Sequence, residues 1–457
     1  MGEQSFDVIV IGAGPAGEVA AGRLAQRGKR RVALVERELI GGECSYYACM
    51  PSKALLRPGE LLDELARVPG AAEAARGRGI DVAAALRRRD EVIHELSDDA
   101  QLPWVERHGI ELVRGQGEIV GERRVRVGER LLEAREAVIV ATGSTAAIPP
   151  IPGLAEAQPW TNREATTSGE VPTSLLILGG GPVGVELAQA WRSLGAEVTL
   201  IEAVDRLLAR EEPFAGEQVA DALRARGVEL RLGARVTQVA RADGRTTVTL
   251  EDGSQVSGAQ LLVASGRRPR TDDLGLERLG LEPGEPIEID ETLRAHDHDW
   301  LYAIGDVNGR TLLTHMGKYQ ARVAADVIAG ESVRLRADGA VSPRVTFTDP
   351  QVAAVGHTLD SAQQAGIAAR AIDLETSSTA GASFHGRNEP GTTRFVIDTA
   401  EQALAGATFV GPEVAELLHA ATIAVVARIP LRTLADAVPA FPTRSELWLK
   451  LLEEAGL

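Results

Sequence analysis

The chain has 457 residues, 44% of them hydrophobic and 4% aromatic, with 48 glycines and a formal net charge of −16. This length and composition are typical of an α/β enzyme with two or more domains. The acidic balance argues against a nucleic-acid or anionic-membrane partner, since both need a basic surface, and no apolar run reaches about 18 residues, so we expect no membrane span.

The first expected element is a strand over residues 6–11, which leaves no room for a signal peptide before it. A glycine turn, a helix over residues 18–27 and a second strand over residues 31–36 follow. This order is the dinucleotide fingerprint in its required context, because glycines permit a tight turn that brings a pyrophosphate to a helix N-terminus. The predicted contacts are the turn glycines and, for a ribose hydroxyl, the acid that ends the second strand: Gly12, Gly14, Gly17 and Glu36.

The only two cysteines lie close together, at Cys44 and Cys49. Pro51 suits the first turn of a helix, where backbone N–H groups and the helix dipole favour a thiolate at Cys49. We interpret the two as a redox pair; two ordinary buried cysteines and half of a metal site are the alternatives, but no second ligand pair exists, so we expect no metal. A pair that cycles between disulfide and dithiol suits a reducing cytoplasm.

Lysine is rare in this chain, at four of 49 basic residues, yet Lys53 follows Cys49 by four positions. Arginine is a planar fork, whereas lysine is a compact point charge on a flexible stem. A site that needs one ammonium at one atom therefore favours Lys53; a solvated surface lysine is the alternative.

The fingerprint returns in the middle of the chain, with a strand over residues 175–178, a helix over residues 185–193 and a strand over residues 197–202. Its turn glycines and terminal acid are Gly179, Gly181, Gly184 and Glu202. Two dinucleotide sites in one chain with a cysteine pair suggest electrons that pass from one dinucleotide to another and on to sulfur.

With these motifs, and with segments such as Ala141-Thr142-Gly143 and Tyr302-Ala303-Ile304-Gly305-Asp306, the chain resembles the class I pyridine nucleotide-disulfide oxidoreductases nearly end to end. The family includes dihydrolipoamide dehydrogenase, glutathione and mycothione reductases and mercuric reductase. The resemblance implies two Rossmann-like dinucleotide-binding domains plus an α+β C-terminal dimerisation domain. We expect FAD-binding parts at residues 1–150 and 269–340, an NAD(P)H-binding domain at 151–268 and a homodimer interface domain at 341–457, in which residues 414–429 form a buried interface helix.

The resemblance also implies roles for individual residues. Cys44 and Cys49 would form the redox disulfide, Cys49 receiving electrons from the flavin and Cys44 facing the substrate, while Lys53 would pair with Glu186 beside the flavin. Asp306 would hold the ribityl chain. The other FAD contacts would be Gly42, Gly117, Ala141, Thr142, Gly143, Thr314 and His315, and Gly266 would contact NAD(P)H.

Glu202 bears on the choice of nicotinamide cofactor. A carboxylate there accepts hydrogen bonds from the ribose hydroxyls of NAD and repels the 2′-phosphate of NADP. We therefore favour NADH, although Arg206 and Arg210 nearby leave NADPH open.

One segment departs from the family pattern. Members that act on thiols usually end in a motif whose histidine, from the other subunit, works as acid and base; here Phe441 takes its place, and Glu446 has no histidine to orient. A positioned acid or base is worth about 10²–10⁴ in rate, so ordinary lipoamide or glutathione turnover should be poor. Tyr46 or Tyr47 could supply a proton, but packing near the flavin is the more ordinary role.

The leading hypothesis is an FAD-dependent NAD(P)H oxidoreductase of the disulfide-reductase type. Its final acceptor would be a disulfide with an easily departing thiol, a quinone or a metal ion. A quinone or diaphorase-type reductase with inactive or regulatory cysteines, and a redox-sensing flavoprotein with little turnover, are the alternatives.

Overall fold

The computed structural model describes residues 4–27, 30–386 and 391–457. The chain divides into two compact units, each built from three segments. Unit 1 contains residues up to Pro51, Asp90–Ala147 and Arg267–Gly339; unit 2 contains Ser52–Arg89, Ile148–Gly266 and Ala340–Leu457. Both predicted FAD-binding parts contribute to unit 1.

Unit 1 is built on a sheet in the order β3-β2-β1-β6-β5-β4, with β16 also paired to β6. The central strands β1, β2 and β6 run parallel. All of β2 and the last four residues of β1 and of β6 are buried, as the continuous apolar run in β1 predicts. The strands are β1 Gln4–Ile11, β2 Val32–Glu36, β3 Glu111–Arg114, β4 Gly117–Gly121, β5 Arg124–Val127, β6 Arg130–Val140, β7 Ser144–Ala146, β15 Arg267–Pro269 and β16 Leu301–Ala303.

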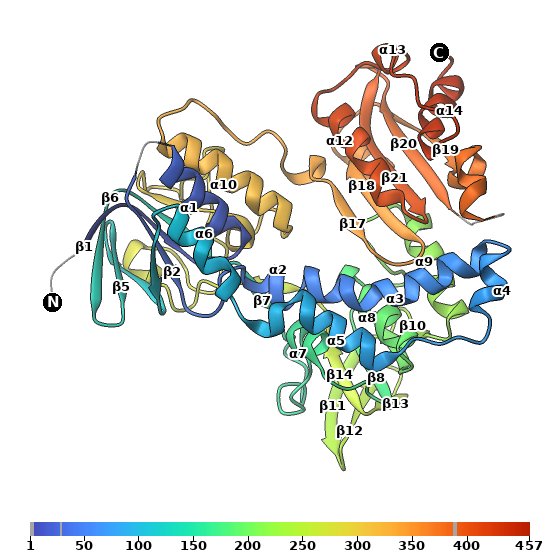
Figure 1. Cartoon of the computed structure of the whole chain (residues 1–457), viewed down its shortest axis with the longest axis horizontal. Helices are drawn as coiled ribbons and strands as arrows, with labels where there is room; N and C mark the ends of the chain where they lie inside the picture. Colours follow the sequence, from blue (N-terminus) through green and yellow to red (C-terminus); the bar gives the residue numbers. More distant parts are fainter. Residues whose placement is uncertain (1–3, 28–29, 387–390) are drawn as a thin grey trace. The chain divides into compact units, whose positions relative to one another are not determined.

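Helices α1 and α10 lie side by side in unit 1 (Figure 1). Ion pairs of Arg23 and Arg27 with Asp326, at 2.7 and 2.8 Å, join the two helices. The helices of this unit are α1 Pro15–Gln26, α2 Gly42–Tyr46, α6 Leu102–Arg107 and α10 Thr314–Ile328, with a 3-10 turn η4 at Gly305–Asn308. One boundary between the units falls within the long helix α3, Cys49–Arg67, and another within α5, Val82–Val92.

The first part of unit 2 has a parallel sheet in the order β10-β9-β8-β14 and a small antiparallel sheet, β11-β12-β13. Its core gathers around the fully buried Trp191 of α8. The strands are β8 Ser174–Leu178, β9 Glu197–Ile201, β10 Glu229–Arg231, β11 Val236–Ala242, β12 Arg245–Leu250, β13 Gln255–Gly258 and β14 Gln260–Val263. The helices are α4 Ala71–Ala75, α5 Val82–Val92, α7 Asn162–Thr167, α8 Pro182–Ser193 and α9 Pro213–Ala225.

The C-terminal part of unit 2 is an antiparallel sheet in the order β17-β18-β21-β20-β19 with helices α11 to α14. Phe395 packs against Phe409 and Trp448 in its core. The strands are β17 Arg344–Thr346, β18 Gln351–Gly356, β19 Ala369–Glu375, β20 Thr392–Asp398 and β21 Ala403–Gly411; the helices are α11 Leu359–Gln364, α12 Leu418–Val426, α13 Leu431–Leu434 and α14 Leu447–Glu454.

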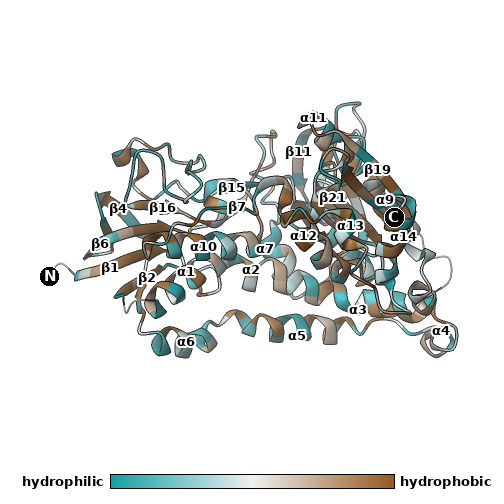
Figure 2. Ribbon diagram, turned by 90° about the horizontal axis from the view of Figure 1, so that it is seen from above, coloured by the Kyte–Doolittle hydropathy of each residue, from teal (hydrophilic) through white to brown (hydrophobic). Residues whose placement is uncertain are grey.

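The helix predicted at residues 414–429 is shorter than expected. A 3-10 turn, η8 Val414–Leu417, precedes α12, and Arg428 takes a left-handed φ of 49°, which ends the helix. The helix α12 is apolar and brown in Figure 2, yet Ile423 and Val426 are exposed at 49% and 41%. A helix that is apolar on both faces normally has packing partners on both.

Candidate functional site

The first glycine turn lies in unit 1 between β1 and α1. Gly12 has φ +102°, and a Cβ added there would lie 2.5 Å from the Ala141 carbonyl oxygen. A Cβ at Gly17 would lie 1.9 Å from the Gly12 oxygen, whereas one at Gly14 would meet no atom within 4 Å. Gly12 and Gly17 are therefore required by the protein itself, while Gly14 leaves open the space where a phosphate group would approach the start of α1.

Glu36 is buried at the end of β2, beside this turn. Its Oε2 accepts a hydrogen bond of 2.7 Å from the Ala13 amide, and its Oε1 accepts one of 2.7 Å from the Glu38 amide. These bonds fix the carboxylate where the fingerprint requires an acceptor for a ribose hydroxyl.

The other residues predicted to contact FAD surround the first turn or continue from it. Gly42, at φ +58°, has its backbone against Gly14, since an added Cβ would lie 2.8 Å from the Gly14 Cα. Gly117 in β4 packs under Ile11 and Val35, at 3.0 and 3.2 Å from an added Cβ. The Ala141 amide donates to Ile11 over 2.8 Å, so the segment 141–143 continues from the sheet beside the turn. The Thr142 hydroxyl donates to the Arg270 carbonyl.

Asp306 belongs to a charged cluster in unit 1. The sequence predicted Asp306 as a site residue but not its partners Ser144 and Arg267. The Ser144 hydroxyl donates to its Oδ2 at 2.5 Å, and Arg267 lies 3.9 Å from the same oxygen. Burial raises the pKa of Asp306, although the Ser144 hydrogen bond and the Arg267 charge act against this. Ser144 and Arg267 directly follow Gly143 and Gly266, which were predicted to contact the cofactors. Their place in the sequence could therefore have identified them as site residues.

The two cysteines are brought together as free thiols. Cys44 lies in α2, and Cys49 is the first residue of α3, as the sequence predicts. The Cys49 sulfur lies 3.6 Å from the Thr314 hydroxyl at the start of α10. The hydrogen bond to Cys49, then burial, raises the pKa of Cys44. The two thiols are therefore within hydrogen-bonding reach of each other.

Tyr46 does not have the geometry of a proton donor. Its side chain is buried, and its hydroxyl donates to the Ile40 carbonyl at 3.0 Å. Burial raises its pKa to about 12. The hydroxyl thus has a structural role in unit 1. Tyr47 packs beside Tyr46 with ring centroids 6.4 Å apart, and His315, near the start of α10, is exposed.

The second glycine turn, in unit 2, repeats the geometry of the first. Gly179 has φ +112°, and an added Cβ would lie 2.5 Å from the Ala264 oxygen. A Cβ at Gly184 would lie 1.9 Å from the Gly179 oxygen, and one at Gly181 would meet nothing within 4 Å. Gly266, two residues after Ala264, has φ +146°. At both turns, therefore, the first glycine has a positive φ, the third lies against a backbone oxygen, and the second faces open space.

Glu202 also repeats the arrangement of Glu36. Its two carboxylate oxygens accept from the Gly180 amide at 2.5 Å and the Val204 amide at 3.0 Å. Arg206, the nearer of the two arginines considered for a phosphate, donates to the Ala209 carbonyl at 2.7 Å.

The Lys53–Glu186 ion pair expected from the sequence is formed within unit 2. Lys53 Nζ lies 2.6 Å from Glu186 Oε2 and 4.8 Å above the Phe347 ring. The other oxygen of Glu186 accepts from the Phe347 amide at 2.9 Å. Because Lys53 follows Cys49 by four residues in α3, both side chains lie on one face of that helix.

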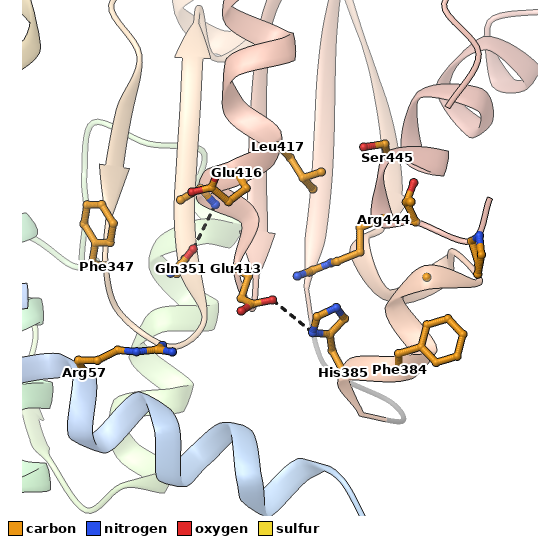
Figure 3. A pocket seen from close by; sticks show the side chains of 14 residues that line it. Arg57, Phe347, Gln351, Phe384, His385, Glu413, Glu416, Leu417, Arg444 and Ser445 are labelled. Atoms are coloured by element: carbon orange, nitrogen blue, oxygen red, sulfur yellow. Dashed lines mark hydrogen bonds and ion pairs between the residues drawn. The ribbon is translucent and has the colours of Figure 1, made fainter. Parts of the chain in front are cut away.

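The C-terminal segment presents Phe441 to solvent at 76% exposure. Glu446 accepts a hydrogen bond of 3.4 Å from the Gly381 amide. Sequence reasoning missed a histidine near this segment: His385 lines the same cavity as residues 442–445, and Glu413 lies beside it (Figure 3). No sequence pattern linked His385 to the C-terminal segment, because His385 and Phe441 are far apart in the chain.

The described residues contain neither a metal site nor a membrane-spanning helix. Among them, no cluster of three or more histidine, cysteine or acidic side chains could hold a metal ion. None of the described helices has both the length and the apolar content to cross a membrane.

Known proteins resemble the chain over nearly its whole length. The family model described as pyridine nucleotide-disulphide oxidoreductase matches residues 6–325, and that of the family's dimerisation domain matches residues 342–451. A dihydrolipoyl dehydrogenase from Chlamydia muridarum is 32% identical, with 97% of this chain and 96% of that protein covered. A mercuric reductase from Staphylococcus aureus is 29% identical, with 96% and 81% covered.

Solved structures also resemble the chain over nearly its whole length. The Cu(II) complex of the HOCl-induced flavoprotein disulfide reductase RclA from Escherichia coli has a TM-score of 0.86 at 26% identity and covers 99% of each chain. LpdA from Mycobacterium tuberculosis gives the same TM-score, identity and coverage. These flavoproteins combine Rossmann-type domains with a dimerisation domain, and the enzymes of the family use FAD and NAD(P)H. With two family models matched in tandem, the chain belongs to the pyridine nucleotide-disulfide oxidoreductase family of FAD-dependent enzymes.

Proposed function

We propose that this enzyme passes two electrons from NADH, by way of FAD, to the Cys44–Cys49 disulfide and from the resulting dithiol to a small acceptor. The single observation that carries the proposal is the contact of Cys44 with Cys49 at the start of α3, in the same unit as the first glycine turn. Two adjacent thiols are suited to thiol–disulfide exchange.

The residues of unit 1 fit FAD. The open space in front of Gly14, the carboxylate of Glu36 and the half-buried Asp306 would accept the pyrophosphate, a ribose hydroxyl and the ribityl chain respectively. When bound, FAD accepts two electrons from the nicotinamide and delivers them to the disulfide. Thr314, in contact with Cys49, would position the sulfur that receives these electrons.

In the exchange step, Cys44 would attack the acceptor, because Cys49 is the sulfur held by the α10 contact. Cys49 would then displace the acceptor sulfur from Cys44 and restore the disulfide. Lys53 would place one positive charge a helical turn from Cys49, and Glu186 would hold that ammonium in position.

Glu202 supports NADH as the reductant, because both carboxylate oxygens are fixed beside the second glycine turn. The guanidinium of Arg206 donates a hydrogen bond to the Ala209 carbonyl. Through the dimerisation domain, we further propose a symmetric homodimer, which would cover the exposed apolar residues of α12.

The acceptor is proposed to need no proton from position 441, because phenylalanine has none to give. A disulfide with an acidic thiol, a quinone or a metal ion meets this condition. Ordinary dihydrolipoamide or glutathione turnover would require a proton donor elsewhere in the molecule.

The test is an anaerobic titration of the FAD-loaded protein with NADH, followed by visible absorbance. We expect four electrons per subunit and, after the first two, a new long-wavelength band that Cys49→Ser removes. Bleaching that is complete after two electrons would instead identify a reductase with bystander cysteines, and turnover below about 1 s⁻¹ with every acceptor would favour a sensor. Cys44→Ser should abolish disulfide reduction; unchanged quinone reduction in that variant would show which acceptors bypass the pair.

A further inference from the structure

The first turn of helix α10 is fixed beside the cysteine pair in unit 1. The hydroxyl of Thr314, the first residue of α10, lies 3.6 Å from the Cys49 sulfur. In the same turn, Gly317 packs on helix α1, since an added Cβ would lie 3.3 Å from the Ala16 methyl group. The start of α10 is therefore held by two contacts, and its side chains have a defined position relative to the thiols.

Lys318 carries a positive charge next to this turn. It is one of only four lysines in the chain, and it follows Thr314 by four residues, so both side chains lie on one face of α10. Lys318 is exposed, and its charge acts to lower the pKa of Cys44 and of Glu18 in α1. The helical spacing and these electrostatic effects both place the ammonium group near Cys44.

Lys318 has no structural role in an ion pair within the described residues. Its Nζ forms no ion pair or hydrogen bond there, whereas Lys53 is paired with Glu186 at 2.6 Å. Burial raises the pKa of Glu18, the carboxyl group on which Lys318 acts, to about 7, so this carboxyl keeps its proton below that pH. A positive charge thus remains available to a ligand beside the thiols.

We propose that Lys318 is a specificity-determining residue of the acceptor site and that its ammonium group attracts disulfides that carry a carboxylate close to the S–S bond. A lysine ammonium is a compact point charge on a flexible stem, so it can reach carboxylates on acceptors of different shape. A charge beside the reacting sulfur also raises the local concentration of anionic acceptors. This inference rests on the proposed function and names its substrate class.

The exchange with such an acceptor conserves atoms and electrons. The Cys44 thiolate attacks one acceptor sulfur, the S–S bond breaks, and the first half of the acceptor departs as a thiolate. The Cys49 thiolate then attacks the Cys44 sulfur, which releases the second half as a thiolate and restores the Cys44–Cys49 disulfide. The acceptor gains the two electrons of the dithiol, whose protons pass to solvent or to the released thiolates. A hydride from NADH, by way of FAD, and one proton from solvent regenerate the dithiol.

The first test measures the charge at Cys44 without turnover. In FAD-loaded Cys49→Ser protein, which keeps Cys44 as its only thiol, alkylation by iodoacetate is compared with alkylation by iodoacetamide at pH 6.5. The two reagents differ in charge but have nearly the same size, and a change in the thiolate fraction of Cys44 affects both rates equally. We expect the added Lys318→Gln to lower the iodoacetate rate about tenfold and the iodoacetamide rate about twofold. Arg334→Gln, on an exposed arginine of unit 1 outside α10, is the matched control and should leave the ratio of the two rates unchanged.

The second test measures turnover of the FAD-loaded enzyme with NADH and two disulfides that release acidic aromatic thiols. One is 5,5′-dithiobis(2-nitrobenzoate), which carries two carboxylates, and the other is the uncharged 4,4′-dithiodipyridine. In Lys318→Gln, kcat/KM should fall about tenfold for the anionic acceptor and about twofold for the neutral one. Lys318→Arg, which keeps the charge, should retain the preference. Higher ionic strength should reduce the advantage of the anionic acceptor with the wild type, because salt screens exposed charges.

An unchanged ratio of alkylation rates in Lys318→Gln, or equal losses of kcat/KM with both acceptors, would overturn the inference. Failure of the proposed function is seen separately, as a wild-type protein that lacks the cysteine-dependent absorbance band or reduces neither acceptor. The alkylation ratio needs no turnover, so it reports on Lys318 in that case as well. Flavin content and thermal midpoint equal to wild type establish that each variant is folded.

Discussion

The two glycine turns have the same backbone constraints but different surroundings. At the first, Ala16 packs under η4 and α10, since Cβ atoms added at Gly305 and Gly317 would lie 3.4 and 3.3 Å from its methyl group. At the second, the corresponding residue is Val183, which is 38% exposed. The first turn is covered by its own unit, whereas the second is open to solvent.

This difference matches the chemistry of the two cofactors. A group that stays on the enzyme gains from a covered site, because burial of its apolar surface slows its release. A substrate that must enter and leave in every turnover needs an open one. Under the proposed function, one short motif would serve both a resident and an exchanging dinucleotide, and the neighbouring elements would decide which.

The largest expected effects come from Gly17→Ala and Gly184→Ala, because each added Cβ would lie 1.9 Å from a backbone oxygen. Such overpacking costs on the order of 3 kcal/mol. We expect Gly17→Ala to purify without flavin, and Gly184→Ala to keep its yellow colour but lose most reduction by NADH. Gly169→Ala, at a site with no atom within 4 Å, is the control. A Gly184→Ala protein reduced at the wild-type rate would contradict the assignment of the two turns.

The next effect concerns the second turn alone. Glu202→Ala removes the acceptor for the ribose hydroxyls and the bonds to Gly180 and Val204. Hydrogen bonds to a charged group are worth about 1.5–3 kcal/mol, so kcat/KM for NADH should fall roughly 10- to 100-fold while that for NADPH changes little. Steady-state rates with the two cofactors measure this. An equal loss with both would show that Glu202 only supports the fold.

A pH effect should distinguish the first turn from the second. Glu18 in α1 has Val185 as its counterpart in α8, and burial raises the pKa of Glu18 from 4.5 to about 7. Between these values the folded state binds more protons than the unfolded state, so stability falls as the pH rises through this window. The shift corresponds to at most about 3 kcal/mol; since the side chain is partly accessible, we expect a loss on the order of 1–2 kcal/mol.

Thermal unfolding at pH 5 and pH 8 measures this loss, and Glu18→Gln should flatten the difference. Glu251→Gln, on an exposed position of unit 2, is the control. A variant whose midpoint depends on pH as steeply as that of the wild type would disprove the role of Glu18.

The smallest effect concerns α10, which covers only the first turn. The positive charge of Lys318 acts to lower the pKa of Cys44, against the larger effects of Cys49 and burial. Lys318→Gln should therefore raise that pKa further and slow alkylation of the reduced protein by iodoacetamide about twofold at pH 8. The same rate as in Lys450→Gln, which changes a lysine on α14, would show that Lys318 has no influence on the thiol.

The sequence alone determined both glycine turns and the placement of Cys49 at a helix start. These features are local, so the chain order expresses them directly. The Lys53–Glu186 pair was expected only from the resemblance to the family, because the two residues lie 133 positions apart. The sequence also showed that position 441 carries no acid or base.

Only the tertiary structure decided what surrounds those features. The Ser144–Asp306 bond, the cover over the first turn and the His385–Glu413 pair all join residues that are far apart in the chain and meet only through packing. Long-range packing depends on how layers stack rather than on local periodicity, and for this reason a histidine 56 positions before Phe441 was invisible until the C-terminal sheet was assembled.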